Sequence, residues 1–283
     1  MNSSTALELL RSYYDIGGWN LMGKGILTKM QSALGQYPDT IGSEEMDIQF
    51  NWRHYTVSTE YPGAERWVKY ERGVAEPGAK RIIDERLSSG SVFVDIGAQC
   101  GDTALYVHSI VGSEGSIHAF EPTTYWCSIL RENIRRNEIE NAVARNEAVG
   151  KQTDELSPEA VVGGRHELMN DTFEQETVNV VCLEDYIESE GLEPDLIQID
   201  VDGAEYDVLQ GAKEYLGTVP VILELHHQKI LDAWEATVEM IIDHCNVYYL
   251  DEQGLFPSQY PFGTEIGHLS QLRSDRVSYL LLD

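Results

Sequence analysis

Basic residues are scarce in this sequence. Its 283 residues include 20 Lys and Arg against 48 Asp and Glu, so the formal net charge is −28 at pH 7. Proteins that bind nucleic-acid backbone neutralise phosphates with clustered bases, and no basic patch stands out here. We therefore expect no DNA partner. Because molar salt screens the self-repulsion of so acidic a chain, we predict a halophilic protein. An acidic protein from an ordinary-salt cytoplasm is the alternative.

Cysteines and long apolar runs are also few. The four cysteines are scattered with no C-x-x-C pair, which favours reduced thiols over disulfides or a zinc site. The N-terminus lacks a basic segment followed by an apolar run, and no stretch is long enough to span a membrane. We expect a cytoplasmic protein without membrane insertion.

Hydrophobic residues make up 42% of the chain, which is enough for a sizeable core. We divide the chain into an extension, residues 1–75, and a main domain, residues 76–283. The apolar spacing predicts four elements in the extension. They are two helices near Leu7–Tyr14 and Gly25–Leu34, a short hairpin in Asp47–Thr59 and a short strand at Trp67–Tyr70. Such an extension forms either a lid over the site or a cover for the core.

The most informative stretch is Val92–Gly101, which reads VFVDIGAQCG. An apolar run ends in Asp95, and the glycine-loop positions Gly97, Ala98 and Gly101 lead into a helical pattern. This is typical of the first strand–loop–helix unit of an open α/β sheet, where a nucleoside ligand binds at the carboxyl edge. Glycine there lets the backbone approach a ligand. The alternative is an ordinary turn whose glycines serve tight packing.

The spacing of this loop indicates the ligand. Dinucleotide folds use G-x-G-x-x-G, whereas this loop reads D-x-G-x-x-x-G. An acid beside the loop repels a pyrophosphate and attracts an ammonium or a sulfonium group. S-adenosylmethionine carries both cations, so we predict it as the cofactor. The same spacing disfavours a dehydrogenase.

Residues after the next two predicted strands complete the cofactor site. The second strand is followed by Glu121 and Pro122, and an acid at this place accepts hydrogen bonds from both ribose hydroxyls. The third strand, Asn141–Val149, carries Glu147 and Ala148 near its carboxyl end. A residue there is a candidate to contact the adenine.

The remaining pattern predicts an α/β fold with a doubly wound, mostly parallel seven-stranded sheet. Leu196–Ile199 is a buried strand, a helix follows over Ala204–Leu216, and Val219–Leu225 is the fifth strand. Val247–Leu250 and Val277–Leu282 are apolar strands with no helical pattern between them. We therefore expect an antiparallel last strand.

Three residues at the carboxyl ends of the fourth and fifth strands are the predicted catalytic group: Asp200, Glu224 and His226. A sugar hydroxyl is a poor nucleophile, so a general base accelerates its reaction. Histidine suits this role near neutral pH. Because adjacent strand residues point in opposite directions, at most one of His226 and His227 faces the site.

We assign the base to His226, with Glu224 on the same face as its orienting carboxylate. Asp200 is a second candidate for the base, and a structural histidine at a strand end is the alternative for His226. We assign no metal ligands. An O,O,N site for Mg²⁺ or Mn²⁺ on these three residues stays open.

Four motifs, in order, resemble a known family. They are VFVDIGAQCGDT, HAFEP, LIQIDVDGAEYDVLQGA and VILELH, and they lie within Glu76–His226. The sequence is similar to the FkbM-type methyltransferases, S-adenosylmethionine-dependent enzymes with the class I methyltransferase fold. Gln198 stands where a Lys is common in that family, and Asp202 where a Glu is common.

The resemblance implies contacts to the cofactor from the loop, the helix start and the second strand: Asp95, Gly97, Gly101, Thr103 and Glu121. It also implies that Asp200 lies where methyl transfer happens in this fold.

Together these observations predict an O-methyltransferase that acts on a small molecule or a sugar or glycan precursor. A carboxyl acceptor, which needs no base, is a further option. The alternatives are a methyltransferase for protein or RNA, and a non-catalytic partner protein that binds S-adenosylmethionine. The sequence leaves a homo-oligomer open.

Overall fold

The fold is described from a computed structural model, which covers residues 45–59, 61, 64, 66–71, 75–157, 177–201, 203–226, 233–250, 264–265 and 277–283. The helices predicted near Leu7–Tyr14 and Gly25–Leu34 lie outside this part of the chain, as do Asp202 and His227. None of the helices that are described is long and apolar enough to cross a bilayer.

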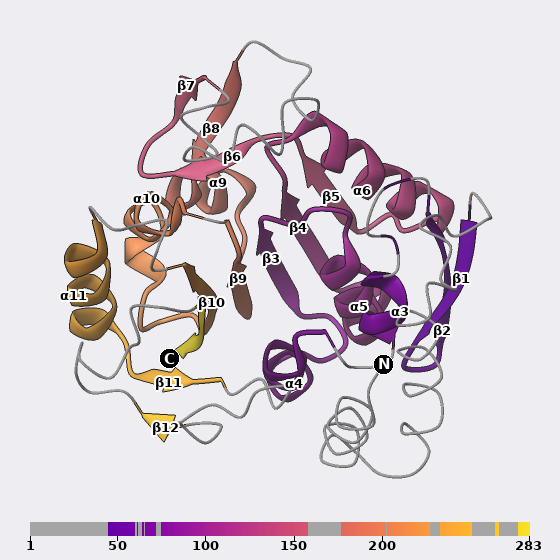
Figure 1. The fold of residues 1–283 in the computed structure, drawn as a ribbon, viewed down its shortest axis with the longest axis horizontal. Helices are drawn as coiled ribbons and strands as arrows, with labels where there is room; N and C mark the ends of the chain where they lie inside the picture. Colours follow the sequence, from indigo (N-terminus) through magenta and orange to yellow (C-terminus); the bar gives the residue numbers. More distant parts are fainter. Residues whose placement is uncertain are drawn as a thin grey trace, which may run out of the picture.

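Eight strands of the described residues form the central sheet, in the order β12-β11-β13-β10-β9-β3-β4-β5 (Figure 1). Their bounds are β3 (Val92–Ile96), β4 (Ser116–Phe120), β5 (Ala142–Arg145), β9 (Leu196–Ile199), β10 (Val221–His226), β11 (Val247–Tyr249), β12 (Thr264–Glu265) and β13 (Val277–Leu282). Neighbouring strands from β10 to β5 are parallel, and β13 runs antiparallel to β10 and β11. The predicted mostly parallel sheet with an antiparallel last strand is confirmed, and the two-residue β12 extends its edge.

Strand β3 occupies the switch point of this sheet. It has β4 on one side and β9 on the other, so the chain winds away from β3 in both directions. Because these strands are parallel, the carboxyl ends of β4, β3, β9 and β10 meet at one edge. Ligands of open α/β sheets bind at this place.

Each face of the sheet packs against its own helices. Phe93 lies on the face covered by α4 (Pro77–Arg86), α5 (Asp102–Val111) and α6 (Thr124–Arg136). Val94 lies on the other face, which is covered by α9 (Leu183–Glu190), α10 (Glu205–Gln210) and α11 (Trp234–His244). Successive strand residues point to opposite faces, so the apolar run of β3 supplies both cores. The doubly wound arrangement is therefore confirmed.

The predicted hairpin of the extension is also confirmed. Strand β1 (Glu45–Phe50) pairs antiparallel with β2 (Arg53–Ser58). The short strand predicted after it is wrong, because its residues lie in the helix α3 (Arg66–Glu71), where Trp67 and Tyr70 are buried. Residues three apart share one face of a helix, and a four-residue stretch is too short to separate that period from a strand's.

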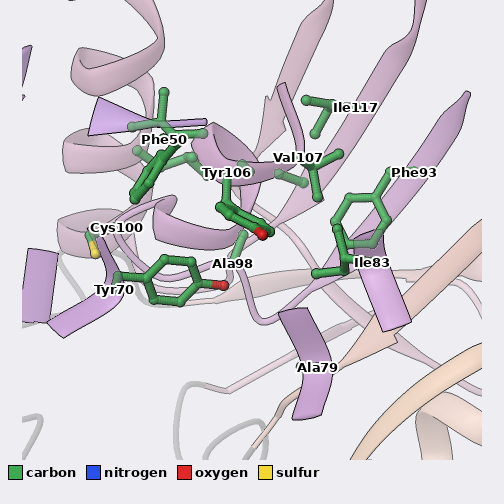
Figure 2. Close-up of a cluster of buried hydrophobic side chains, with 14 of the residues drawn as sticks. Phe50, Tyr70, Ala79, Ile83, Phe93, Ala98, Cys100, Tyr106, Val107 and Ile117 are labelled. Carbon is green, nitrogen blue, oxygen red and sulfur yellow. The ribbon is translucent and has the colours of Figure 1, made fainter. Parts of the chain in front are cut away.

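Aromatic rings of the extension complete the core near the β3–α5 loop. The rings of Phe50, Tyr70 and Tyr106 pack edge to face, with centroids 5.6 to 6.0 Å apart. Figure 2 shows them in one cluster with Ala98 and Cys100 of the loop. The described part of the extension therefore packs into the same core as the sheet. The domain boundary at residue 75 stays a prediction.

A second sheet has three strands, in the order β6-β8-β7. They are β6 (Ala148–Gly150), β7 (Asp154–Leu156) and β8 (Val178–Cys182). The single strand predicted over Asn141–Val149 is thus wrong, since it divides between two sheets. Asn146 lies at the division and donates its side-chain N–H groups to the carbonyls of Glu121 and Pro122, each at 3.0 Å. These bonds hold the chain against the end of β4 instead of continuing the ladder.

The helix predicted over Ala204–Leu216 is shorter than expected. Helix α10 ends at Gln210, and a 3₁₀ turn, η2 (Lys213–Tyr215), follows. Gly211 separates them, where a Cβ would lie 2.0 Å from the carbonyl oxygen of Gly150. Contact with the second sheet therefore decides where this helix ends.

Candidate functional site

Asp95 lies near the end of β3 with an unsatisfied carboxylate. Asp95 is only 1% exposed, and its Oδ2 has no hydrogen-bond partner among the described residues. Burial raises the pKa of Asp95 to about 8; the charges of Asp102 and Glu121 add to this, and Arg66 opposes it. A buried carboxylate oxygen without a donor is a feature that a cationic ligand group would satisfy.

The predicted loop glycines are both required by the protein itself. Gly97 has φ +94°, and a Cβ there would lie 1.8 Å from the main-chain oxygen of Asp200. Gly101 has φ +89°, and a Cβ there would lie 2.5 Å from Cδ1 of Leu130. The tight-packing interpretation therefore explains both positions. Contact of Gly97, Ala98 and Gly101 with a cofactor stays a prediction.

Glu121 follows β4, and its carboxylate accepts hydrogen bonds from Gln99 and Thr123. Its Oε2 accepts from the main-chain N–H of Gln99 at 3.0 Å. Its Oε1 accepts from the N–H of Thr123 at 2.8 Å and from the hydroxyl of Thr123 at 2.6 Å. The carboxylate thus ties the end of β4 to the β3–α5 loop. Pro122 is tied in turn by the amide of Asn146.

Glu147 and Ala148, the residues predicted near the adenine, stand at the start of the second sheet. The carboxylate of Glu147 pairs with the guanidinium of Arg145 at 2.6 Å. Ala148 is buried as the first residue of β6. Their place just past β5 keeps them near the carboxyl edge of the main sheet.

The start of α5 is fastened to the extension. The hydroxyl of Thr103 lies 2.7 Å from the hydroxyl of Tyr70. The neighbouring Asp102 is ion-paired with Arg66, which also reaches Glu76 at 3.1 Å. Thr103 is thus buried against a tyrosine, and a direct role at the cofactor stays a prediction.

The three predicted catalytic residues converge on one place, which we call the edge cluster: Asp200, Glu224 and His226. One side-chain ligand atom from each lies within 4.8 Å of the others. His226 Nε2 is 3.3 Å from Glu224 Oε1. The cluster adjoins the cofactor loop, because Asp200 is the residue whose carbonyl oxygen Gly97 approaches.

Glu205 is the functional neighbour whose role the sequence did not reveal. Its Oε1 lies 2.7 Å from Nδ1 of His226 and accepts from the main-chain N–H of His226 at 3.2 Å. The carboxylate is fully buried. The predicted orienting residue, Glu224, contacts the other ring nitrogen. The signal for Glu205 was its place in the acidic DVDGAE stretch after β9, but its partner is 21 residues away on the next strand.

The electrostatics of the edge cluster follow from these contacts. Burial and the charge of Glu224, with a smaller effect of Glu76, raise the pKa of Asp200 well above its usual range. Burial alone would lower the pKa of His226, but its hydrogen bonds to Glu205 and Glu224 outweigh that effect and raise it to about 9. The site thus concentrates negative charge around one imidazole.

Residues 95–247 of this chain match the methyltransferase FkbM domain. The match covers more than half of the 283 residues. The chain belongs to the FkbM methyltransferase family. Its matched span holds the loop after β3, the end of β4 and the whole edge cluster. The resemblance seen in the four motifs is therefore confirmed.

Solved methyltransferases resemble this FkbM protein at low sequence identity. Methyltransferase FkbM from Methylobacillus flagellatus KT is 15% identical, with a TM-score of 0.47 over 70% of this chain and 44% of its own. A SAM-dependent O-methyltransferase from Thermotoga maritima is 11% identical, with a TM-score of 0.42 over 73% and 64%. Fibrillarin from Aeropyrum pernix, solved with natively bound S-adenosyl-L-methionine, is 12% identical, with a TM-score of 0.41 over 87% and 84%. The chain thus spans less than two thirds of the first two proteins. No curated protein matches its sequence.

Proposed function

We propose that this FkbM-family protein transfers a methyl group from S-adenosylmethionine to an oxygen atom of a small molecule or a sugar or glycan precursor. The observation that carries the proposal is Asp95, whose buried Oδ2 lacks a donor, beside a loop that touches the edge cluster through Gly97. A site for a cationic donor and a group of side chains able to handle a proton therefore meet at one edge of the sheet.

The residues around β3 and β4 fit the cofactor. Asp95 would pair with its α-amino group, and α5 begins directly after the same loop. Glu121 accepts hydrogen bonds from the main-chain N–H groups of Gln99 and Thr123, which fix its carboxylate at this edge. An ionised acid at this place accepts ribose hydroxyls. When bound, S-adenosylmethionine supplies a methyl group on a positively charged sulfur.

The reaction is an in-line displacement. The acceptor O–H bond breaks and its proton leaves, the oxygen forms a bond to the methyl carbon, and the carbon–sulfur bond breaks with its electron pair going to sulfur. Alignment alone supplies about 7–11 kcal/mol of the barrier in well-oriented reactions. The close packing of Gly97 on Asp200 supports this alignment, because it ties the loop after β3, where the cofactor would bind, to the end of β9, where the acceptor would bind.

The edge cluster is where we place the loss of the acceptor proton. A group that removes a proton in the transition state contributes about 10²–10⁴-fold to a rate. Nδ1 of His226 is held by Glu205, so Nε2 is the nitrogen that faces Asp200 and Glu224. Because the pKa of His226 is about 9, its imidazole is a free base mainly at alkaline pH. At that pH, replacing His226 with Ala should lower kcat by that factor and leave the affinity for S-adenosylmethionine unchanged. An unchanged kcat would remove His226 from the reaction.

The acidic composition adds to the proposal. A net charge of −28 suits a cytoplasm with a high salt concentration, which screens the repulsion between like charges. The same charge repels nucleic-acid phosphates, so it favours a low-molecular-weight acceptor over a nucleic acid. A nucleotide- or lipid-linked sugar meets this description.

Calorimetry with S-adenosylmethionine, S-adenosylhomocysteine and NAD tests the cofactor. We expect both sulfur ligands to bind and NAD not to bind. Replacing Asp95 with Asn should weaken S-adenosylmethionine by at least about 30-fold, since a buried charge loses its partner. Absence of binding by both sulfur ligands would overturn the proposal.

Incubation of extracts with tritium-labelled S-adenosylmethionine tests the acceptor. We expect the label in a small molecule or glycan. Label in protein or RNA would replace the proposed acceptor class, and binding without any labelled product would indicate a non-catalytic partner protein.

A further inference from the structure

The edge cluster has the composition of a metal site. It contains two carboxylates and one imidazole on the ends of adjacent strands, with their ligand atoms within 4.8 Å of one another. We propose that Asp200, Glu224 and Nε2 of His226 bind one divalent cation, Mg²⁺ or Mn²⁺, on the acceptor side of the site. Its place beside the acceptor rests on the proposed function, whereas the binding itself does not.

The distances suit a hard cation. Donor atoms that share one Mg²⁺ in octahedral geometry, each at about 2.1 Å from it, lie roughly 3 to 4.2 Å apart. Glu224 Oε1 and His226 Nε2 are separated by 3.3 Å, inside that range. The remaining spread, up to 4.8 Å, is within the reach of a small carboxylate rotation. The backbone therefore already brings the three ligands to one point.

The surroundings of His226 are those of a metal-bound histidine. A ligating imidazole donates its other ring N–H to a carboxylate or carbonyl, which fixes the tautomer and raises its basicity. Here Nδ1 of His226 lies 2.7 Å from Oε1 of Glu205, and the carboxylate of Glu205 is fully buried. When Nδ1–H of His226 donates to Glu205, the lone pair of Nε2 is on the side of Glu224 and Asp200. Glu205 is thus a positioning residue.

Glu224 is oriented in the same way from the opposite strand. The hydroxyl of Tyr279, on β13, donates to Oε1 of Glu224 at 3.0 Å. The two residues face each other in the register of the antiparallel pair. Two of the three proposed ligands are therefore fixed by an outer residue.

The charge of the region calls for a cation. Among the described residues, Asp200, Glu205 and Glu224 have no ion pair with a lysine or arginine, and the ion pairs that Glu205 and Glu224 make are both with His226. Oε2 of Glu205 also has no hydrogen-bond donor in this part of the chain. Buried charges in proteins are paired or bind metals. When ionised, the three carboxylates exceed the charge of the one imidazole, and a divalent ion would balance them.

The donor set selects the ion. Carboxylate oxygens suit Mg²⁺ and Mn²⁺, one imidazole favours Mn²⁺ of the two, and no thiolate is present to select zinc. Three protein ligands leave coordination positions for water and for an acceptor oxygen. A cation there would make an acceptor hydroxyl more acidic, and its proton would pass to solvent. In this arrangement the ion takes over the activation of the acceptor from His226, which becomes a ligand, and His226→Ala lowers kcat through loss of the ion.

Binding of Mn²⁺, followed by electron paramagnetic resonance of the free ion, tests the proposal on the full chain without cofactor. Titrations belong in about 1 M KCl, because the Debye length of about 3 Å there suppresses attraction to the acidic surface. We expect one saturable Mn²⁺ per chain, which Mg²⁺ displaces. His226→Ala and Glu224→Gln should abolish it, while Glu239→Gln makes the same charge change on an exposed residue of α11 and should bind as the parent does.

Glu205→Gln separates a ligand site from mere acidity. The outer partner of a ligating histidine contributes about 10–100-fold to metal affinity. We expect a loss of that size, with S-adenosylmethionine affinity unchanged and the circular dichroism of the parent. Absence of saturable Mn²⁺ binding in the parent would overturn the proposal. An affinity for Mn²⁺ in His226→Ala, Glu224→Gln and Glu205→Gln equal to that of Glu239→Gln would overturn it as well.

Calorimetry with S-adenosylmethionine on the same samples keeps this proposal distinct from the function. Cofactor binding and methyl transfer that persist in EDTA would overturn the proposed place of the ion beside the acceptor and leave the methyltransferase proposal intact. Saturable Mn²⁺ without any methyl transfer would support the metal site and count against the proposed function.

Discussion

The two halves of the sheet edge hold their acids in different ways. At the ends of β3 and β4, Glu121 is held by main-chain N–H groups and a threonine, and Oδ2 of Asp95 has no donor. At the ends of β9 and β10, Glu205 and Glu224 contact His226, and Asp200 lies within 4.8 Å of Glu224 and His226. We call the first half, which is organised by backbone donors, the cofactor half, and the second, which is organised by side chains, the acceptor half, after the roles that the proposed function gives them.

The halves meet at the backbone of Asp200. Gly97 packs on its carbonyl, and its N–H donates to the carbonyl of Ile96 at 2.9 Å. Main-chain atoms therefore set the distance between the two halves. A side chain inserted at Gly97 acts on both halves at once.

Gly97→Ala should have the largest effect. A Cβ would lie 1.8 Å from a main-chain oxygen at a residue with φ +94°, so overpacking and left-handed strain together predict a loss of about 3–5 kcal/mol. Urea unfolding at constant salt measures this. Gly90→Ala is the matched control, because Gly90 has φ +91° with nothing within 4 Å of its Cβ. Equal losses in the two variants would show that backbone strain, and not the contact between the halves, explains Gly97.

Arg66→Ala should follow, and it acts on the cofactor half alone. It removes the ion-pair partner of Asp102, whose side chain is 3% exposed, while Arg66 itself is 33% exposed. An uncompensated buried charge predicts a loss of about 2–4 kcal/mol. The comparison is Arg81→Ala, which breaks the exposed pair with Glu85 and should change stability by less than about 1 kcal/mol. Thermal melting of both variants at one pH decides whether the extension stabilises the start of α5.

The sequence allows the local geometry at the ends of β3 and β4 to be predicted better than the contacts at the ends of β9 and β10, and the reason is locality. Asp95 and its loop are contiguous in the sequence. An apolar run followed by an acid and glycines is typical of one structure, a buried strand that leads through a tight loop into a helix. The contact between Glu205 and His226 depends on where α10 places a side chain against β10, 21 residues away. The division at Asn146 depends on carbonyls 24 and 25 residues earlier. In both cases the contacting residues lie more than 20 positions apart, so no local sequence pattern indicates the contact.

The raised pKa of Asp95, in the cofactor half, predicts that the stability of the protein depends on pH. Its folded pKa of about 8 lies above the ordinary value of 3.8, so the folded state retains a proton that the unfolded state has lost. Stability should therefore be greatest below about pH 4 for this group and fall as the pH rises to about 8. Asp95→Asn should lack this decline, so its melting temperature relative to the parent should rise as the pH goes from about 4 to 8. Thermal melting of both proteins across that range measures it.

The same group predicts proton release on cofactor binding. A cation beside Asp95 favours the carboxylate, so S-adenosylmethionine should displace a proton between pH 5 and 7, and its affinity should rise with pH toward about 8. Calorimetry in buffers of different ionisation enthalpy measures the proton. Asp243→Asn, on an exposed position of α11, should keep the release that Asp95→Asn loses. Release that persists in Asp95→Asn would assign it to another group.

Tyr279→Phe should have the smallest effect, and it isolates the acceptor half. The variant keeps the ring and removes only the hydroxyl that donates to Glu224 at 3.0 Å. A hydrogen bond to a charged group contributes about 1.5–3 kcal/mol at most, and here the exposed share of Glu224 lets water replace part of it, so about 1 kcal/mol is expected. Mn²⁺ affinity should fall by less than in Glu205→Gln, because Glu224 can still turn its carboxylate to the ion, whereas a misplaced imidazole cannot. S-adenosylmethionine affinity should not change. A loss of cofactor affinity in Tyr279→Phe would show that the two halves are coupled through more than the backbone contact at Gly97.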